Sequence, residues 1–152
     1  MNLAYDVVHA LQGKTLATAE SCTGGGIGNA VTGISGASAV YKGGVISYCN
    51  EIKHRLLAVD ADMLEEFGAV SAPVAKAMAQ GARRALQADV AVSSTGLLGP
   101  AGDDFGNPVG TVFLGYADEK NVISRQFQFS GSREAVRKQA IAAALQMILE
   151  QL

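Results

Sequence analysis

The chain has 152 residues, of which 49% are hydrophobic and 17% are charged, and its formal net charge is −2. This length fits one domain with its own core, because domains commonly span about 100–150 residues, and we expect a single domain over residues 1–152. No basic run is present, which argues against a nucleic-acid surface. Neither a signal peptide nor an apolar run of the ~20 residues that span a bilayer is seen, so we expect a cytoplasmic protein without a membrane segment.

Residues that bind metals are sparse. The chain has two cysteines, Cys22 and Cys49, and two histidines, His9 and His54. No Cys-x-x-Cys or His-x-x-x-His pair occurs, and no carboxylate cluster has the spacing of metal ligands. We therefore expect no metal and no cofactor, and two reduced thiols instead of a disulfide framework.

Hydrophobic periodicity and turn residues predict helices and strands that alternate through most of the chain. The expected helices cover residues 2–12, 24–32, 51–58, 60–67, 71–87 and 132–152. The expected strands cover residues 15–18, 40–49, 89–95, 109–117 and 122–129. A short turn joins the last two strands, which predicts an antiparallel hairpin. The predicted architecture is a three-layer α/β/α fold on a mixed sheet of about five strands.

A polar turn joins the first strand to the second helix, with the sequence Thr-Ala-Glu-Ser-Cys-Thr-Gly-Gly-Gly over residues 18–26. In α/β proteins such turns bind ligands, because the free N–H groups of the helix's first turn point at them. Ser21 could act there as a nucleophile. The alternative is that Ser21 or Thr23 caps the helix and the glycines form a tight turn. Cys22 is a rival nucleophile by type, but no histidine lies nearby in sequence to activate it.

The helix expected over residues 51–58 carries a candidate base. With Asn50 as its N-cap, Ile52, Leu56 and Val59 face inward and Lys53 falls in the first turn. The helix dipole disfavours a protonated amine there, and burial would act in the same direction. A neutral lysine beside a serine hydroxyl is a general base. The alternative is a solvated lysine, and the sequence alone does not bring it close to Ser21.

Two further loops carry polar residues. The strand end Ser-Ser-Thr-Gly, which includes Thr95 and Gly96, offers hydroxyls and a backbone turn. Asp103 and Asp104 lie in the long Gly/Pro loop that follows and could form an acid/base pair. Ordinary turn chemistry is the alternative in both cases.

Arg133 and Arg137 lie one turn apart at the start of the last predicted helix. Two guanidinium groups together with free helix N–H groups would bind an anion. The alternative is two surface arginines on a solvated face.

Several motifs in this order resemble the C-terminal domain of the competence/damage-inducible protein CinA. The stretches that carry the resemblance are Thr18-Ala-Glu-Ser-Cys-Thr-Gly-Gly, Tyr41-Lys-Gly-Gly-Val-Ile-Ser-Tyr-Cys-Asn-Glu, Gly68-Ala-Val-Ser, Gly99-Pro with Pro108-Val-Gly-Thr-Val, and Ser130-Gly-Ser-Arg with Arg137. Stand-alone members of this family are nicotinamide-nucleotide amidases.

The resemblance implies hydrolysis of the carboxamide of nicotinamide mononucleotide to nicotinate mononucleotide and ammonia, in pyridine-nucleotide salvage and in a homodimer. It implies Ser21 as the nucleophile, Lys53 as the base and Tyr48 as an assisting group. For this mechanism we expect backbone N–H groups near Thr23–Gly25 to hold the oxyanion, and a helix N-terminus together with Arg133 and Arg137 to hold the phosphate. The residues expected to bind the substrate are Thr23, Gly24, Gly25, Thr95, Gly96, Arg133 and Arg137.

Two positions depart from the family's usual pattern. Leu98 stands where alanine is usual, and Ser132 where aspartate is usual. Two other functions remain open: a catalytically silent nucleotide-binding or regulatory module on the same fold, and an esterase or peptidase that uses the same serine and lysine.

Overall fold

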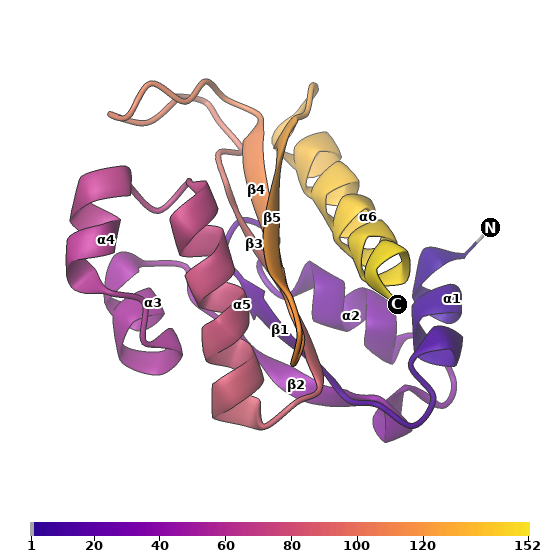
Figure 1. Ribbon diagram of the computed structural model, residues 1–152. Helices are drawn as coiled ribbons and strands as arrows, with labels where there is room; N and C mark the ends of the chain where they lie inside the picture. Colours follow the sequence, from indigo (N-terminus) through magenta and orange to yellow (C-terminus); the bar gives the residue numbers. More distant parts are fainter. Residues whose placement is uncertain (1) are drawn as a thin grey trace.

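Five strands form one mixed sheet in the order β2-β1-β3-β4-β5 (Figure 1). The computed structural model describes residues 2–152. The strands are β1 (Leu16–Glu20), β2 (Tyr41–Ile46), β3 (Val90–Gly96), β4 (Thr111–Ala117) and β5 (Val122–Gln128). β1 is parallel to both β2 and β3, whereas β4 is antiparallel to β3 and β5. The expected mixed sheet with one terminal hairpin is confirmed.

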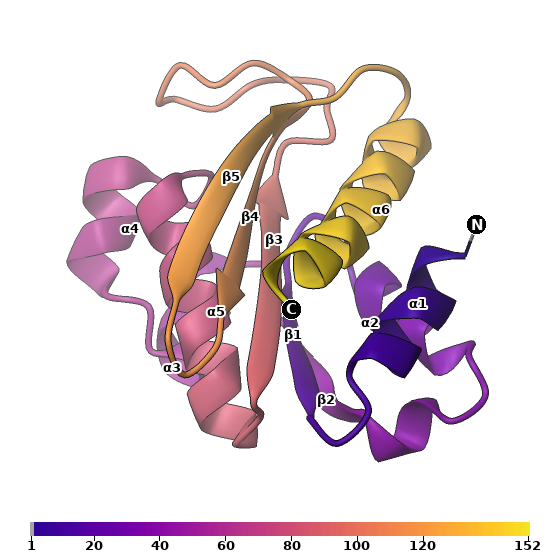
Figure 2. The ribbon, with the colours of Figure 1, turned by 45° about the vertical axis from the view of Figure 1, so that its right-hand side comes forward.

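Helices cover both faces of this sheet. They are α1 (Leu3–Ala10), α2 (Gly26–Thr32), α3 (Asn50–Leu57), α4 (Ala61–Phe67), α5 (Ala72–Leu86) and α6 (Arg133–Gln151), with a short 3-10 helix, η1 (Ala37–Ala39). Helices α1, α2 and α6 lie on one face, and α3, α4 and α5 lie on the other (Figures 1 and 2). The three-layer architecture predicted from the sequence is therefore confirmed. Among residues 2–152, no helix combines the length and the apolar character needed to cross a membrane.

Two hydrophobic clusters fill the space on the two faces of the sheet. The larger lies under α1, α2 and α6, and the smaller lies under α5 and the neighbouring ends of α3 and α4. β1 contributes to both, because successive side chains of a strand point to opposite faces. Leu16 belongs to the larger cluster, and Ala17 and Ala19 belong to the smaller. These short alanine side chains let α5 pack closely against β1.

β1 ends later than the sequence predicts. The expected strand stopped at Thr18, but the pairing continues to Glu20, which lies opposite Ile46 of β2 and Ser94 of β3. Strands on both sides hold this segment, and single-sequence periodicity does not contain that information. As a result Ser21 is the first residue beyond the paired strand.

The predicted cap and inner face of α3 were wrong, except that Val59, just beyond the helix, is buried as predicted. Cys49 instead of Asn50 occupies the N-cap position, and its side chain makes no capping hydrogen bond. Leu56 is 54% exposed, Ile52 is only partly buried, and Lys53 is 1% exposed. A helix face predicted from apolar periodicity always places lysine on the solvent side. Such a prediction therefore fails for a helix that buries a lysine.

Gly81 sets the distance between α5 and α3. A Cβ atom at this position would collide with the carbonyl oxygen of Leu57, the last residue of α3. We expect Gly81→Ala to lower the free energy of unfolding by about 1–3 kcal/mol, the usual cost of overpacking. Helix propensity alone predicts the opposite sign, a gain of about 1 kcal/mol.

Urea denaturation measures this difference. Ala85→Gly, at an exposed position of the same helix, is the matched control and reports helix propensity alone. A Gly81→Ala protein as stable as the original, or more stable, would contradict the close packing of the two helices.

Candidate active site

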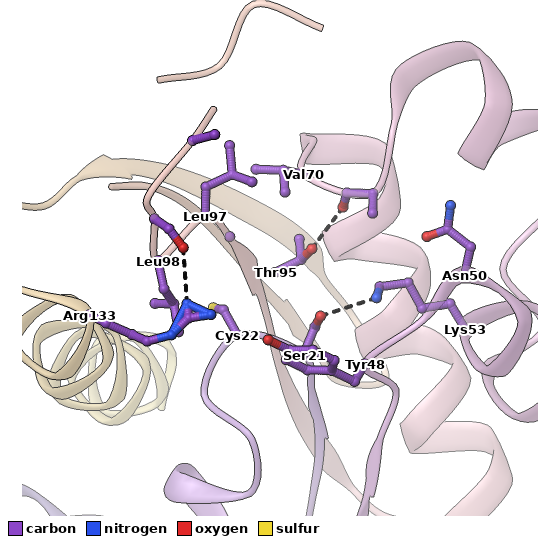
Figure 3. A pocket seen from close by; sticks show the side chains of 14 residues that line it. Ser21, Cys22, Tyr48, Asn50, Lys53, Val70, Thr95, Leu97, Leu98 and Arg133 are labelled. Atoms are coloured by element: carbon purple, nitrogen blue, oxygen red, sulfur yellow. Dashed lines mark hydrogen bonds between the residues drawn. The ribbon is translucent and has the colours of Figure 1, made fainter. Parts of the chain in front are cut away.

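The site lies where the parallel strands β1 and β2 end beside β3. Ser21 follows β1, Tyr48 lies just beyond β2, and Thr95 and Gly96 are the last residues of β3. Together with the start of α3 these residues line a pocket of about 290 Å³ (Figure 3). Its other walls come from the segments that precede α5 and follow β3, and from the start of α6.

Lys53 contacts Ser21 directly inside this pocket. Its Nζ atom donates to Ser21 Oγ at 3.1 Å and to the carbonyl oxygen of Ser47 at 2.7 Å. Lys53 is 1% exposed and Ser21 is 8% exposed. No carboxylate in residues 2–152 forms an ion pair with Lys53. The ammonium group is thus buried with only uncharged acceptors.

Burial lowers the pKa of Lys53 below its ordinary value of 10.5, and charge on Cys49 or Cys22 would act in the opposite direction. The lysine sits at the first main-chain hydrogen bond of α3, from its own N–H to the carbonyl oxygen of Cys49. The positive end of the helix dipole there also disfavours a proton on the amine. The arrangement keeps a larger share of Lys53 neutral at a given pH than a solvated lysine would have, so its lone pair can accept a proton.

Cys22 is a poor nucleophile in this environment. Its side chain is 2% exposed, and burial raises its pKa to about 11, against a smaller opposing effect of the Ser94 hydroxyl. Since only the thiolate is strongly nucleophilic, Cys22 stays inert at neutral pH. Ser21 is the nucleophile candidate that contacts a buried lysine, and no carboxylate in residues 2–152 pairs with that lysine.

The first turn of α2 is occupied by the protein itself. Glu20 is 2% exposed, and its Oε1 accepts the N–H of Ile27 at 2.8 Å and the hydroxyl of Thr23 at 2.7 Å. Its Oε2 accepts the N–H of Gly28 at 3.0 Å. The prediction that free N–H groups of this helix point at a ligand was therefore wrong. Glu20 was not among the site residues predicted from the sequence, although an acidic residue shortly before a helix start is a signal, because the dipole favours it there.

The turn after Ser21 leaves other N–H groups available. The N–H of Ser21 donates to the carbonyl oxygen of Ser94, and the N–H of Gly24 donates to that of Ser21. In the described part of the chain, the N–H groups of Cys22 and Thr23 donate to no protein oxygen. Gly24 and Gly25 have φ of 59° and 97°, a backbone conformation that favours glycine. The unpaired N–H groups of the turn thus begin at Cys22, one residue earlier in the chain than predicted, and of these two residues only Cys22 lines the pocket.

The remaining predicted site residues divide into two groups. Tyr48, Thr95, Gly96 and Arg133 line the pocket, with Tyr48 62% exposed at its mouth. The hydroxyl of Thr95 already donates to the carbonyl oxygen of Ala69 (Figure 3). The second group, which does not line the pocket, comprises Thr23, Gly24, Gly25 and Arg137.

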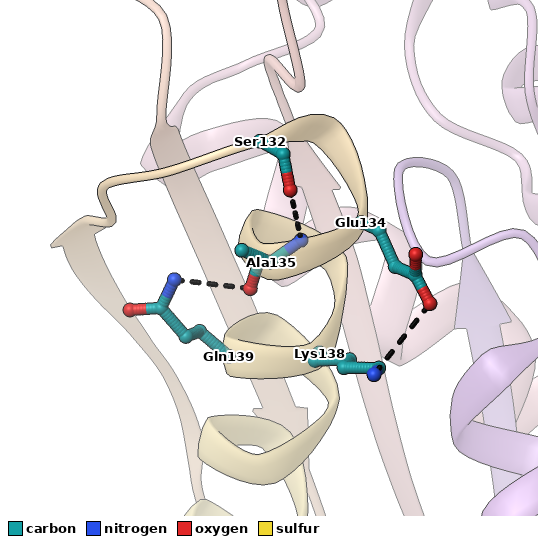
Figure 4. Close-up of polar contacts among 5 residues, drawn as sticks. All are labelled: Ser132, Glu134, Ala135, Lys138 and Gln139. Carbon is teal, nitrogen blue, oxygen red and sulfur yellow. Dashed lines mark hydrogen bonds and ion pairs between the residues drawn. The ribbon is translucent and has the colours of Figure 1, made fainter.

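The start of α6 presents the two arginines differently. Ser132 caps the helix by accepting the N–H of Ala135 at 3.1 Å (Figure 4), and aspartate is an equally favoured residue for such a cap. Arg133 reaches the pocket wall and donates to the carbonyl oxygen of Gly99. Arg137 donates to the carbonyl oxygen of Cys22 at 3.3 Å, on the turn that follows Ser21. One arginine faces the pocket, and the other holds that turn.

The two loop aspartates do not form an acid/base pair. Asp103 accepts hydrogen bonds from the backbone of Phe105 and from both the backbone and the side chain of Asn107. It thereby closes its own loop, which was the alternative considered. Residues 2–152 contain no group of three His, Cys, Asp or Glu side chains that could hold a metal ion.

Thiol reactivity tests the description of Cys22. We expect iodoacetamide at pH 8 to alkylate Cys49, which is exposed, and to leave Cys22 unmodified in the folded protein. Mass spectrometry of peptides locates the adducts, and the same reaction in concentrated urea is the control in which both thiols react. Rapid alkylation of Cys22 in the folded protein would contradict its burial and its raised pKa.

Comparisons with known proteins identify relatives over nearly the whole chain. The family model of the CinA C-terminal domain matches residues 2–152. The nicotinamide-nucleotide amidohydrolase PncC of Escherichia coli (strain K12) is 45% identical, over 99% of this chain and 93% of that protein. A CinA-like protein of Geobacter sulfurreducens is also 45% identical, over 93% of this chain. This chain spans only 34% of that longer relative's length.

Solved structures share the whole fold. The CinA superfamily protein ECK1530/EC0983 of Escherichia coli superposes with a TM-score of 0.97 at 33% identity, covering 99% of this chain and 89% of that one. The competence/damage inducible protein CihA of Agrobacterium tumefaciens gives a TM-score of 0.94 at 37% identity, over 97% of this chain and 92% of that one. From the family-model match and these relatives we conclude that the chain belongs to the CinA C-terminal domain family.

Proposed function

We propose that this protein hydrolyses the carboxamide of nicotinamide mononucleotide to nicotinate mononucleotide and ammonia, with Ser21 as nucleophile and Lys53 as base. The observation that carries the proposal is the 3.1 Å contact between Lys53 Nζ and Ser21 Oγ inside the pocket. The activity named for the Escherichia coli relative, which this chain covers over 93% of its length, supports the choice of substrate.

The proposed reaction has two stages. Neutral Lys53 takes the hydroxyl proton of Ser21, and Ser21 Oγ bonds to the amide carbon. The N–H groups of Cys22 and Thr23 hold the negative oxygen that forms. The protonated Lys53 then gives its proton to the departing nitrogen, which leaves as ammonia. Lys53 next takes a proton from water, and the resulting hydroxide bonds to the ester carbon. The bond from that carbon to Ser21 Oγ then breaks, the acid leaves, and Lys53 returns its proton to Ser21 Oγ.

The pocket walls suit the two ends of this substrate. Val70, Leu97 and Leu98 provide apolar surface for a flat aromatic ring. Arg133 lies at the wall formed by the start of α6, where its guanidinium group and the first N–H groups of the helix favour a phosphate. Tyr48 at the pocket mouth would assist proton transfer to the leaving group.

The family resemblance extends the proposal beyond the site. We expect the protein to act in pyridine-nucleotide salvage, as a homodimer and in the cytoplasm. Size-exclusion chromatography with light scattering would test the dimer.

Replacing the nucleophile tests the reaction. We expect Ser21→Ala to reduce ammonia release from nicotinamide mononucleotide by about 10³-fold or more, because no other group can form the ester. Ser38→Ala, at an exposed hydroxyl on η1, is the control and should retain full activity. Ammonia is measured in a coupled assay, and circular dichroism checks the fold.

Two results would favour the other functions. Wild-type protein that binds the nucleotide without releasing ammonia would identify a silent binding module. Turnover of simple esters or peptides without a requirement for phosphate would identify an esterase or peptidase.

The pH dependence tests the base. Lys53 accepts a proton only when neutral, so kcat/KM should rise with pH through the pKa of Lys53 and level off above it. Because burial lowers that pKa, the midpoint should lie below 10.5. Lys53→Arg, which stays protonated, should be inactive across the range. A rate that is flat or falls as pH rises would contradict the assignment.

A further inference from the structure

Glu20 precedes Ser21 in the chain, yet its carboxylate does not line the pocket. It lies beneath the start of α2, where two backbone N–H groups and one hydroxyl reach it at 2.7–3.0 Å. An acceptor-only carboxylate matches these partners, because an N–H group can only donate. The amide of glutamine would place an N–H₂ group against at least one of these donors.

A chain of hydrogen bonds leads from this carboxylate across the turn. Thr23 donates its hydroxyl proton to Glu20, so the Ser94 hydroxyl, 2.6 Å from Thr23 Oγ1, must donate to Thr23. The backbone carbonyl oxygen of Ser94 in turn accepts the N–H of Ser21. Glu20 is therefore connected to both ends of residues 21–23 and to the end of β3.

This connection determines two features of the pocket at once. It leaves Ser21 Oγ facing Lys53, and it leaves the N–H groups of Cys22 and Thr23 without a protein acceptor among the described residues. A reacting atom displaced by about 1 Å costs on the order of 10²-fold in rate. The turn therefore has to be held as firmly as the nucleophile itself.

We propose that Glu20 is a positioning residue for Ser21, which acts through α2 and Thr23 and never touches the substrate. The inference rests on the proposed serine chemistry but does not depend on which amide is the substrate. It predicts a loss in kcat with little change in KM, because the pocket walls that bind substrate do not include Glu20.

Glu20 also borders a second hollow of about 180 Å³ between α2 and β2, lined in part by Gly25, Gly28 and Tyr41. A small carboxylate such as formate could enter there and replace the missing group in Glu20→Ala. Partial recovery of kcat by formate, absent with chloride at equal ionic strength, would indicate that the carboxylate itself is needed.

The main experiment compares Glu20→Gln with Asp89→Asn. Asp89 is a matched control because its carboxylate also accepts a backbone N–H and a hydroxyl, both from Thr15, at the other end of β1. At a temperature where circular dichroism shows both variants folded, we expect kcat of Glu20→Gln to fall about 10²-fold with KM changed less than about threefold. Asp89→Asn should keep the wild-type kcat.

A second readout separates this inference from the proposed substrate. A fluorophosphonate probe reacts with an activated serine, losing fluoride as the oxygen bonds to phosphorus, and needs no amide substrate. We expect Ser21 to be labelled more slowly in Glu20→Gln than in the wild type. Slower labelling in a protein that does not hydrolyse the nucleotide would support the inference and refute the proposed substrate.

Three outcomes would overturn the inference. The first is a folded Glu20→Gln protein with wild-type kcat and labelling rate. The second is a wild-type protein in which Ser21 neither turns over substrate nor reacts with the probe. If Glu20→Gln fails to fold, Thr23→Val replaces it, because this change removes only the hydroxyl that links Glu20 to Ser94. The third outcome is an unchanged kcat in Thr23→Val.

Discussion

The burial of the Lys53 amine is the constraint on which the site depends. Removing an ammonium group from water costs several kcal/mol unless a partner compensates, and here the partners are the hydroxyl of Ser21 and the carbonyl oxygen of Ser47. Neither carries a charge, so the neutral amine is favoured and the pKa falls. The same contact orders the ends of β1 and β2 and the start of α3 around one pocket.

Close helix packing makes that burial possible. α5 lies against the short alanine side chains of β1 and carries a glycine at its contact with α3. The backbones of the two helices therefore approach closely at the end of α3, one turn after Lys53. Small residues far from the pocket thus determine the position of the base.

The carboxylate of Glu20, beneath the turn that follows Ser21, has a structural role at the start of α2. The positive end of α2 is neutralised internally by Glu20. The site proposed for the substrate phosphate is instead the start of α6, where Ser132 provides the cap and Arg133 reaches the pocket. Glu20 thus has a structural partner at the start of α2, while the guanidinium group of Arg133 belongs to the pocket wall.

Sequence alone determined the layered architecture, the order of helices and strands, and the identity of Ser21 and Lys53 as candidates. Periodicity, glycine turns and ordered motifs are local signals, and they can be recognised without knowledge of the fold. The tertiary structure decided that α3 buries its lysine and exposes Leu56, since that choice depends on acceptors supplied by the residues that follow β1 and β2. It also decided that Glu20 occupies the start of α2, because the carboxylate meets its partners only after strand and helix have packed together.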